Sequence, residues 1–422
     1  MSGVNRPELL SPAGSMESLK AAVNGGCDAV YLGGKQFSAR QYAGNFDLKE
    51  LEDACDYCHL RGVKVYVTVN TVYKDEELAG FLTYIRSLYE MGVDALIMQD
   101  TGAERLVKAH FPDFPLHAST QMTCNSLADV KYWEGRGFDK IVLSRELSLE
   151  EIKHITENTE AEIETFVHGA LCVCYSGQCI MSSMLGGRSG NRGRCAQTCR
   201  LPYTLYKGYD SMAEGYLLSP KDVMTVELLP QLIEAGIASL KIEGRMKSPE
   251  YVAGVTRIYR KYIDLYFENP EEYKVDPADI KALQQLFNRG GFTEGYYTSF
   301  AGREMMSIER PKSWGLKVGI VDKYLPKYKK VTIRTREPLV PGDGLEIWTQ
   351  TEPHVGTNVS KHSKAGEVIT ITLEGDINKN DVVYRTFGKA LQDELKKTYE
   401  KDTRKLPIYG MLRVKEGEPI SL

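Results

Sequence analysis

Five of the nine cysteines in the 422-residue sequence lie in one short stretch, between positions 172 and 199. Cys172 and Cys179 form one pair, and Cys195 and Cys199 form a second pair after a glycine-rich loop. Thiolate is the metal-binding form of cysteine, and four converging thiolates can hold a 4Fe–4S cluster. Four thiolates also suit tetrahedral zinc, and a set of buried, inert cysteines is a third interpretation. The residues alone leave these alternatives open.

The spacing and the neighbours of these cysteines add detail. Cys195 and Cys199 are four residues apart, which puts them on one face if the segment is helical. Glycine and serine neighbours leave backbone amides free to hydrogen-bond cluster sulfur. Cys174, two residues beyond Cys172, is expected to be a fifth, non-ligand cysteine. The remaining four cysteines are expected to fill core positions: Cys27, Cys55, Cys58 and Cys124.

Composition indicates the compartment. The start of the chain has no basic segment followed by an apolar one, and no uncharged apolar run of about 18 residues occurs. An odd cysteine count without an export signal argues against a disulfide framework. We therefore expect a cytoplasmic protein without a membrane partner. The formal charge of −4 neither supports nor excludes nucleic acid as a partner.

The elements that must position the cysteines repeat one pattern. Eight short apolar runs are each followed by a turn and a helical stretch, which is typical of parallel strands buried on both faces. About 250 residues of such units match a TIM barrel. A doubly wound open sheet is the alternative, but no glycine-rich dinucleotide turn follows the first run. The predicted strands are Glu8–Gly14, Asp28–Gly34, Lys64–Asn70, Asp94–Asp100, Leu116–Thr123, Lys140–Glu146, Ile163–Gly169 and Ser239–Arg245.

The barrel is expected to span residues 1–300, with a cysteine-rich insertion at 170–238. A hairpin is predicted in this insertion, with Leu201–Tyr206 pairing with Tyr216–Ser219. From Trp314 the pattern changes to alternation, which predicts a small β-barrel or sandwich within residues 301–400. Its predicted strands are 316–321, 330–335, 345–348, 367–373 and 381–385, and a helix at 388–399 follows. Residues 401–422 are expected to begin a further domain.

Polar residues at the carboxyl ends of barrel strands are the candidates for chemistry. Lys241, Glu243 and Arg245 alternate, so they are expected on one face of the eighth strand, where Arg245 can bind a carboxylate with two hydrogen bonds. A salt-bridge network that closes the barrel is the alternative. His168 is a candidate proton donor, although a satisfied core histidine fits equally well. Gln121 and Arg145 are further candidates for substrate binding.

The insertion is basic. Residues 170–209 contain no aspartate or glutamate but carry Arg188, Arg192, Arg194, Arg200 and Lys207. This local charge suits an RNA backbone, with Arg188, Arg192 and Arg194 as candidate contacts. Tyr175 and Tyr203 are candidates to stack on an extruded base. The alternative is a solvated loop whose arginines stabilise an anionic thiolate cluster.

The cysteine-rich stretch resembles a known signature. The pattern Glu-x-Phe-x-x-Gly-Ala-aliphatic-Cys, followed by Gly-x-Cys-x-x-Ser, is carried by Glu164, Phe166, Gly169, Ala170, Leu171, Cys172, Gly177, Cys179 and Ser182. It is similar to the signature of the collagenase-like peptidase family U32, and matching phrases extend over residues 5–300, among them Leu218–Asp222 and Lys241–Lys247.

The resemblance implies a 4Fe–4S cluster rather than zinc, and membership of the branch of the family that hydroxylates RNA. It further implies hydroxylation without molecular oxygen, with prephenate as the source of the hydroxyl group. The phrase at residues 186–203 is most similar to members that form 5-hydroxycytidine in 23S rRNA, and hydroxylation of the tRNA wobble uridine is the second expectation. Peptidase activity finds no support in the residues, because neither His-Glu-x-x-His nor Gly-x-Ser-x-Gly occurs.

Overall fold

A computed structural model describes residues 5–41, 43–299, 302–350 and 352–420. Its centre is a closed barrel of eight parallel strands, in which each strand pairs with the next in sequence and β11 pairs with both β1 and β7. The predicted TIM-like barrel is therefore confirmed. The strands are β1 (Glu8–Pro12), β2 (Ala29–Gly33), β3 (Lys64–Val69), β4 (Ala95–Met98), β5 (Leu116–Ala118), β6 (Lys140–Val142), β7 (Glu162–Ala170) and β11 (Ser239–Ile242).

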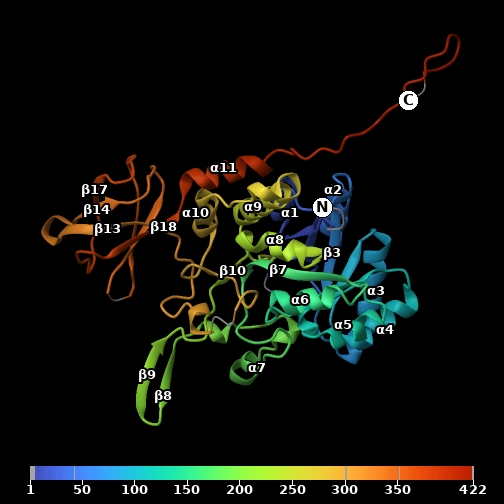
Figure 1. The fold of residues 1–422 in the computed structure, drawn as a ribbon, viewed down its shortest axis with the longest axis horizontal. Helices are drawn as coiled ribbons and strands as arrows, with labels where there is room; N and C mark the ends of the chain where they lie inside the picture. Colours follow the sequence, from blue (N-terminus) through green and yellow to red (C-terminus); the bar gives the residue numbers. More distant parts are fainter. Residues whose placement is uncertain (1–4, 42, 300–301, 351, 421–422) are drawn as a thin grey trace.

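Helices between the strands cover the outside of the barrel (Figure 1). Polar caps start several of them: Asp47 and Glu50 form a capping box at α2, and Ser148 and Glu151 form another at α6. The covering helices are α1 (Met16–Asn24), α2 (Leu48–His59), α3 (Leu78–Glu90), α4 (Thr101–His110), α5 (Leu127–Glu134), α6 (Leu149–Thr156), α8 (Leu229–Glu234) and α9 (Pro249–Glu268). Among the residues described, no helix is both long and apolar enough to cross a bilayer.

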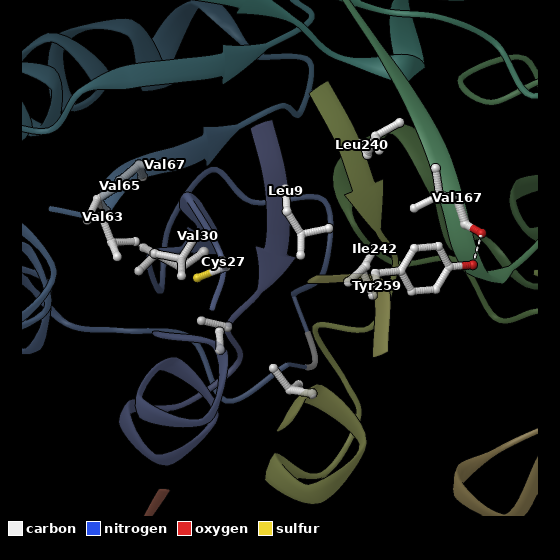
Figure 2. Close-up of a cluster of buried hydrophobic side chains, with 14 of the residues drawn as sticks. Leu9, Cys27, Val30, Val63, Val65, Val67, Val167, Leu240, Ile242 and Tyr259 are labelled. Carbon is white, nitrogen blue, oxygen red and sulfur yellow. Dashed lines mark hydrogen bonds between the residues drawn. The ribbon is translucent and has the colours of Figure 1, made fainter. Parts of the chain in front are cut away.

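Successive side chains of each strand point alternately out of and into the barrel, which gives one apolar core between the strands and the helices and a second one inside the barrel. Outward residues such as Leu9, Val30 and Leu240 pack against the helices, and Tyr259 of α9 donates a hydrogen bond of 2.7 Å to the carbonyl of Val167 (Figure 2). Inward residues form a smaller apolar cluster: Leu10, Ala29, Tyr31, Tyr66, Ala95 and Ile97. The same interior holds buried ion pairs, Lys140 with Glu8 at 2.7 Å and Lys241 with Glu164 at 2.6 Å.

The insertion leaves the barrel at the end of β7 and returns through β10 (Asp222–Met224), which runs antiparallel to β7 with Asp222 opposite Ala170. The short strand β12 (Phe292–Thr293) pairs with β10. Within the insertion lie the helix α7 (Met181–Gly186) and a two-stranded hairpin of β8 (Tyr203–Lys207) and β9 (Asp210–Gly215), which projects from the body of the molecule (Figure 1).

The predicted hairpin exists, but its second arm was wrong. Gly208, at φ 64°, makes a tight turn possible directly after Lys207, which pairs with Asp210. The returning strand is therefore β9 and not Tyr216–Ser219. Tyr216 instead donates its backbone N–H to the carbonyl of Ile308, at 2.8 Å.

The C-terminal part contains a six-stranded antiparallel sheet with its own apolar core. Its order is β16 (Val355–Asn358), β15 (Gly344–Trp348), β18 (Val382–Phe387), β13 (Leu316–Leu325), β14 (Lys330–Thr335) and β17 (Val368–Thr372). The helix α10 (Pro277–Leu286) precedes the sheet, and α11 (Lys389–Tyr399) returns from it to pack on α9 and α1. Residues 401–420 contain no helix or strand. Asp402 accepts hydrogen bonds from Tyr57 and Arg61, and the chain beyond these contacts extends away (Figure 1), so a further domain beginning at 401 stays a prediction.

Candidate active site at the mouth of the barrel

A cavity of about 160 Å³ lies at the carboxyl ends of the barrel strands. Residues from the barrel and from the insertion line it together, and these include most of the predicted candidates. The candidates in its wall are Gln121, Arg145, Cys172, Cys179, Cys195, Lys241, Glu243 and Arg245. Lys241, Glu243 and Arg245 all line this cavity, although β11 ends at Ile242, so only Lys241 lies on the strand itself.

Glu243 is the anion of the cavity. Its carboxylate accepts a hydrogen bond of 3.2 Å from Arg40 and one of 3.3 Å from the Tyr31 hydroxyl. Burial raises the pKa of Glu243, but the positive charges of Arg40, Arg145 and Arg245 outweigh burial and lower this pKa to about 2. Glu243 is therefore a carboxylate at neutral pH.

Arg245 and Lys241 are both held by buried partners. Arg245 donates hydrogen bonds to the hydroxyls of Thr68 at 2.6 Å and Ser38 at 2.8 Å, and burial lowers its pKa to about 10. Lys241 pairs with Glu164, and its ammonium lies 4.6 Å from the centre of the Tyr31 ring. Lys241 therefore takes part in a buried salt bridge, as in the alternative of a salt-bridge network that closes the barrel.

Arg145 is the cavity cation with spare hydrogen-bonding capacity. Its guanidinium stacks 3.8 Å from the centre of the Phe166 ring and donates to the Ser176 hydroxyl at 3.3 Å. Its buried Nε has no partner among the described residues, and neither does Oε2 of the adjacent Glu146. A planar guanidinium in the wall of a cavity suits a carboxylate ligand.

The insertion cysteines differ in environment from the other four. Cys172 and Cys195 are exposed and Cys174, Cys179 and Cys199 are half-buried, whereas Cys27, Cys55, Cys58 and Cys124 are fully buried. The structure therefore agrees with the core role predicted for the latter four.

The insertion cysteines also influence one another. The pKa of Cys199 is raised to about 11, because burial and the charges of Cys172, Cys195 and Cys179 together outweigh the opposing charge of Arg200. Cys195 Sγ accepts a hydrogen bond of 3.4 Å from the backbone N–H of Gln197. Cys195 does not share a helix with Cys199, since Cys199 lies in an isolated 3-10 turn, Thr198–Arg200. Within the described ranges, no three histidine, cysteine, aspartate or glutamate side chains are close enough to share one metal ion.

Close backbone contacts seat the insertion on the barrel. A Cβ at Gly177 would lie 2.1 Å from the carbonyl oxygen of Gln121, and a Cβ at Gly193 would lie 2.6 Å from that of Ser38. The side chain of Asn191 donates to the carbonyl of Gly177 at 2.8 Å. These contacts bring the cysteines over the strand ends.

Two arginines of the insertion, Arg192 and Arg200, also help to hold it against the barrel. Arg192 binds both oxygens of Glu77, at 2.9 and 2.6 Å, and lowers the pKa of that carboxyl to about 2. Arg200 is directed inward and donates to Ser219 at 2.7 Å and to the carbonyl of Leu171 at 3.1 Å. The guanidinium of Arg192 is paired with Glu77, and contact of Arg192 with RNA stays a prediction. Arg188 donates to the backbone carbonyl of Arg194 at 3.0 Å.

His168 does not belong to the cavity. The pairing of β7 with β11 shifts by one residue between Phe166 and His168, and this bulge turns His168 to the outside of the barrel. There it is fully buried against Tyr251, Tyr259 and Phe292, and burial lowers its pKa to about 3. His168 therefore lies in the core between the barrel and the outer helices, as in the alternative of a core histidine.

The two tyrosine candidates are separated as well. Tyr175 lines the cavity, whereas Tyr203 does not, and its hydroxyl donates to the carbonyl of Thr198 at 2.8 Å. Four further residues of the site were not predicted from the sequence: Tyr31, Ser38, Arg40 and Thr68.

Tyr31 and Thr68 could have been found, because alternate residues of a barrel strand point into the barrel and both occupy such positions on predicted strands. No sequence pattern marks Arg40, which lies in an irregular loop.

A closed parallel barrel with polar side chains gathered at its carboxyl-terminal mouth defines the architecture of TIM-barrel enzymes. The chain belongs to peptidase family U32, whose sequence model matches residues 14–307. It is 37% identical over 352 residues to a tRNA hydroxylation protein of Bacillus subtilis (strain 168), covering 81% of this chain and 83% of the relative.

Other relatives carry different names. The chain is 40% identical over 371 residues to a 23S rRNA 5-hydroxycytidine synthase of Escherichia coli (strain K12), covering 86% of this chain but only 55% of the relative. It is also 36% identical over 312 residues to a protein named collagenase from Porphyromonas gingivalis (strain ATCC BAA-308 / W83), covering 70% of this chain and 74% of the relative.

Proposed function

We propose that this chain is an enzyme that hydroxylates a base of RNA, and that Cys172, Cys179, Cys195 and Cys199 hold a 4Fe–4S cluster for that reaction. The proposal is carried by one observation. Three of these cysteines line a single cavity together with the buried charges Lys241, Glu243 and Arg245. The relatives named for hydroxylation of tRNA and rRNA supply the class of substrate and reaction.

We propose a cluster rather than a single zinc ion, because a cluster tolerates sulfurs that lie further apart. Zinc bonds of about 2.3 Å to sulfur require the four sulfurs of a tetrahedral site to lie about 3.8 Å apart. The described cysteines are not gathered so tightly. In a 4Fe–4S cluster each thiolate binds a different iron, so wider spacing is tolerated. Burial raises the pKa of the Cys199 thiol to about 11 and the charge of Arg200 offsets only part of that rise, so the proposal requires iron itself to stabilise this thiolate.

The bound cluster would supply electron transfer or Lewis acidity at the cavity. The protein residues bind and orient the reactants. Arg145, which lines the cavity with its guanidinium stacked on Phe166, binds a carboxylate of the hydroxyl donor, for which we propose prephenate. Glu243 remains ionised, is held by Arg40, and offers a fixed negative charge that can accept a hydrogen bond from a substrate amine or hydroxyl. Tyr175 in the cavity wall offers a ring on which the extruded base can stack.

Among RNA targets, cytidine of 23S rRNA is the first proposal and the tRNA wobble uridine the second. The sequence phrase at 186–203 and the higher identity favour rRNA, while the fuller coverage of the tRNA relative favours tRNA. Mass spectrometry of nucleosides from tRNA and rRNA of a deletion strain separates the two. Restoration of one modified nucleoside by the chain identifies the target, and no change in either pool contradicts the proposal.

The cluster is tested by anaerobic purification of the whole chain, followed by visible spectroscopy and iron and sulfide analysis. Broad visible absorption with about four irons per chain is expected, lost in Cys195→Ser and retained in the control Cys174→Ser. A colourless protein with one zinc per chain would support a zinc-stabilised RNA-binding module. Hydrolysis of collagen-like peptides, abolished by one point substitution in the cavity, would support a peptidase.

A further inference from the structure

A second, larger cavity of about 500 Å³ lies beside the first. The loop after β2 and the insertion segment 190–194 form the wall between them. Ser38 lines the outer cavity, while its neighbours Ala39 and Arg40 line the inner one. In the insertion, Gly190 and Asn191 line the inner cavity, whereas Arg192 and Arg194 line the outer one. Consecutive residues of the same two segments therefore face two neighbouring chambers.

Most polar side chains of the outer cavity are paired with other described residues, and the exceptions are Gln36, Gln41 and Arg194. Its wall holds three basic and two acidic side chains, which leaves one positive charge in excess. Arg192 is neutralised by Glu77, and Lys35 lies 3.1 Å from Asp47. Arg194 is exposed and makes no side-chain hydrogen bond or ion pair with any described residue, so it is the cation available to a ligand.

Aromatic and amide groups complete the chamber. Phe37 is half-buried at φ 62°, a left-handed conformation that is strained for a bulky residue, and its ring rests on Tyr73 and Phe81. The exposed amides of Gln36 and Gln41 have no side-chain partner among the described residues. A held ring, free amides and one unpaired arginine are the groups that bind a base, its polar edge and a phosphate.

We propose that the outer cavity binds an unpaired nucleotide of the RNA substrate that neighbours the target nucleotide. This inference rests on the proposed function. A base that enters the inner cavity must be splayed from its neighbours, which then need their own binding surface. The outer cavity has the volume of a typical small-ligand site. Only the loop after β2 and the insertion segment 190–194 separate it from the inner cavity, which the cysteines line. It takes a nucleotide through stacking on Phe37, amide contacts from Gln36 and Gln41, and a phosphate on Arg194.

Gly80 provides a selective way to close this cavity. It lies in the first turn of α3 and lines the chamber, and a Cβ built on it would meet no atom within 4 Å. A larger side chain therefore enters open space rather than the core. Gly80→Leu narrows the chamber, and Gly80→Ala is the matched control, since alanine only improves helix propensity.

The test measures binding of purified total tRNA and, separately, total ribosomal RNA to the whole chain. Gly80→Leu is expected to weaken the binding of one RNA pool about tenfold, because one stacked base is lost. The affinity of Gly80→Ala should stay within about twofold of that of the native chain. Arg194→Ala is expected to weaken binding and to reduce the slope of log affinity against log salt by about one. Arg105→Ala, an exposed position on α4, is the charge-matched control and should leave the slope unchanged.

The outcomes separate this inference from the proposed function. If the native chain binds neither RNA pool, the RNA substrate itself is wrong. If it binds RNA but Gly80→Leu and Gly80→Ala behave alike, the RNA substrate stands and the nucleotide assignment of the outer cavity is overturned. If Gly80→Leu keeps RNA affinity but loses binding of prephenate, the chamber takes the small acid instead. Circular dichroism and thermal unfolding of each variant establish that it folds.

Discussion

The Cα of Gly177 approaches Gln121 so closely that a Cβ would lie 2.1 Å from the Gln121 carbonyl oxygen. Gly177 also has φ 86°, which side chains rarely adopt. This contact joins the loop between Cys172 and Cys179 to the end of β5. The cysteine loop can therefore reach the cavity only with glycine at this position.

Gly177→Ala is expected to displace the cysteine loop while the barrel core stays intact. Iron retained after anaerobic reconstitution should fall several-fold, with little change in the melting temperature. Gly187→Ala is the matched control, because Gly187 has φ 63° but a Cβ there meets no atom within 4 Å. Equal iron content in both variants would show that the close contact does not position the ligands.

Lys241→Met is expected to destabilise the protein by about 3–5 kcal/mol, because it leaves the Glu164 charge unpaired inside the barrel. Urea unfolding measures the change. Lys49→Met, at an exposed pair with Glu52, should cost less than about 1 kcal/mol. The double variant Lys241→Met/Glu164→Leu should recover part of the loss, and failure to recover any would argue against charge burial as the cause.

The pH dependence of stability should report Glu243. Since its pKa in the folded protein, about 2, is lower than its ordinary value of 4.5, its contribution is present above pH 4.5 and lost as the pH falls towards 2. Arg40→Met removes a cation that binds Glu243, so the pKa of Glu243 should rise towards 4.5, and the loss of stability below pH 4.5 should be smaller and complete at a higher pH. Denaturation at a series of pH values measures this. The difference should vanish when Glu243→Gln is added, and identical profiles for the native chain and Arg40→Met would contradict the assignment.

Thiol reactivity should divide the cysteines into two groups. Burial raises the pKa of Cys55 and Cys124 to about 12, and raises that of Cys27 and Cys58 further. Iodoacetamide at neutral pH should therefore spare these four in the native, metal-free protein. Mass spectrometry should find alkylation first at the exposed Cys172 and Cys195 and more slowly at the half-buried Cys174, Cys179 and Cys199.

Reconstitution with iron and sulfide should then protect four of the five insertion cysteines and leave Cys174 reactive. Protection of Cys174 in place of Cys179 would exchange their proposed roles. Unchanged alkylation of all five after reconstitution would remove the cluster from this site.

Much of the barrel could be predicted because buried parallel strands leave continuous apolar runs, such as Lys64–Val69. The outer helices likewise show an apolar face, as in α2, where Leu51, Ala54 and Cys55 are buried. The edge strand β16 could not be found, since the sequence Val-Gly-Thr-Asn at Val355–Asn358 has neither a clear apolar alternation nor a buried residue.

The site was predictable only in part. Lys241 and Glu243 lie two residues apart, so their meeting in one cavity could be read from the sequence. The orientation of His168 could not, because a bulge in β7 shifts the period by one residue and depends on pairing with β11. The neutralisation of Arg192 by Glu77 joins residues 115 positions apart, and local charge counting does not detect it.

The pairing of Ala170 with Asp222 carries one more consequence. The chain departs from the barrel and comes back at adjoining positions, so residues 171–221 form a loop whose two ends are already tied together. All four cysteines proposed as cluster ligands lie within this loop. The proposed cluster-binding unit therefore enters and leaves the body of the protein at a single point, the pair formed by Ala170 and Asp222.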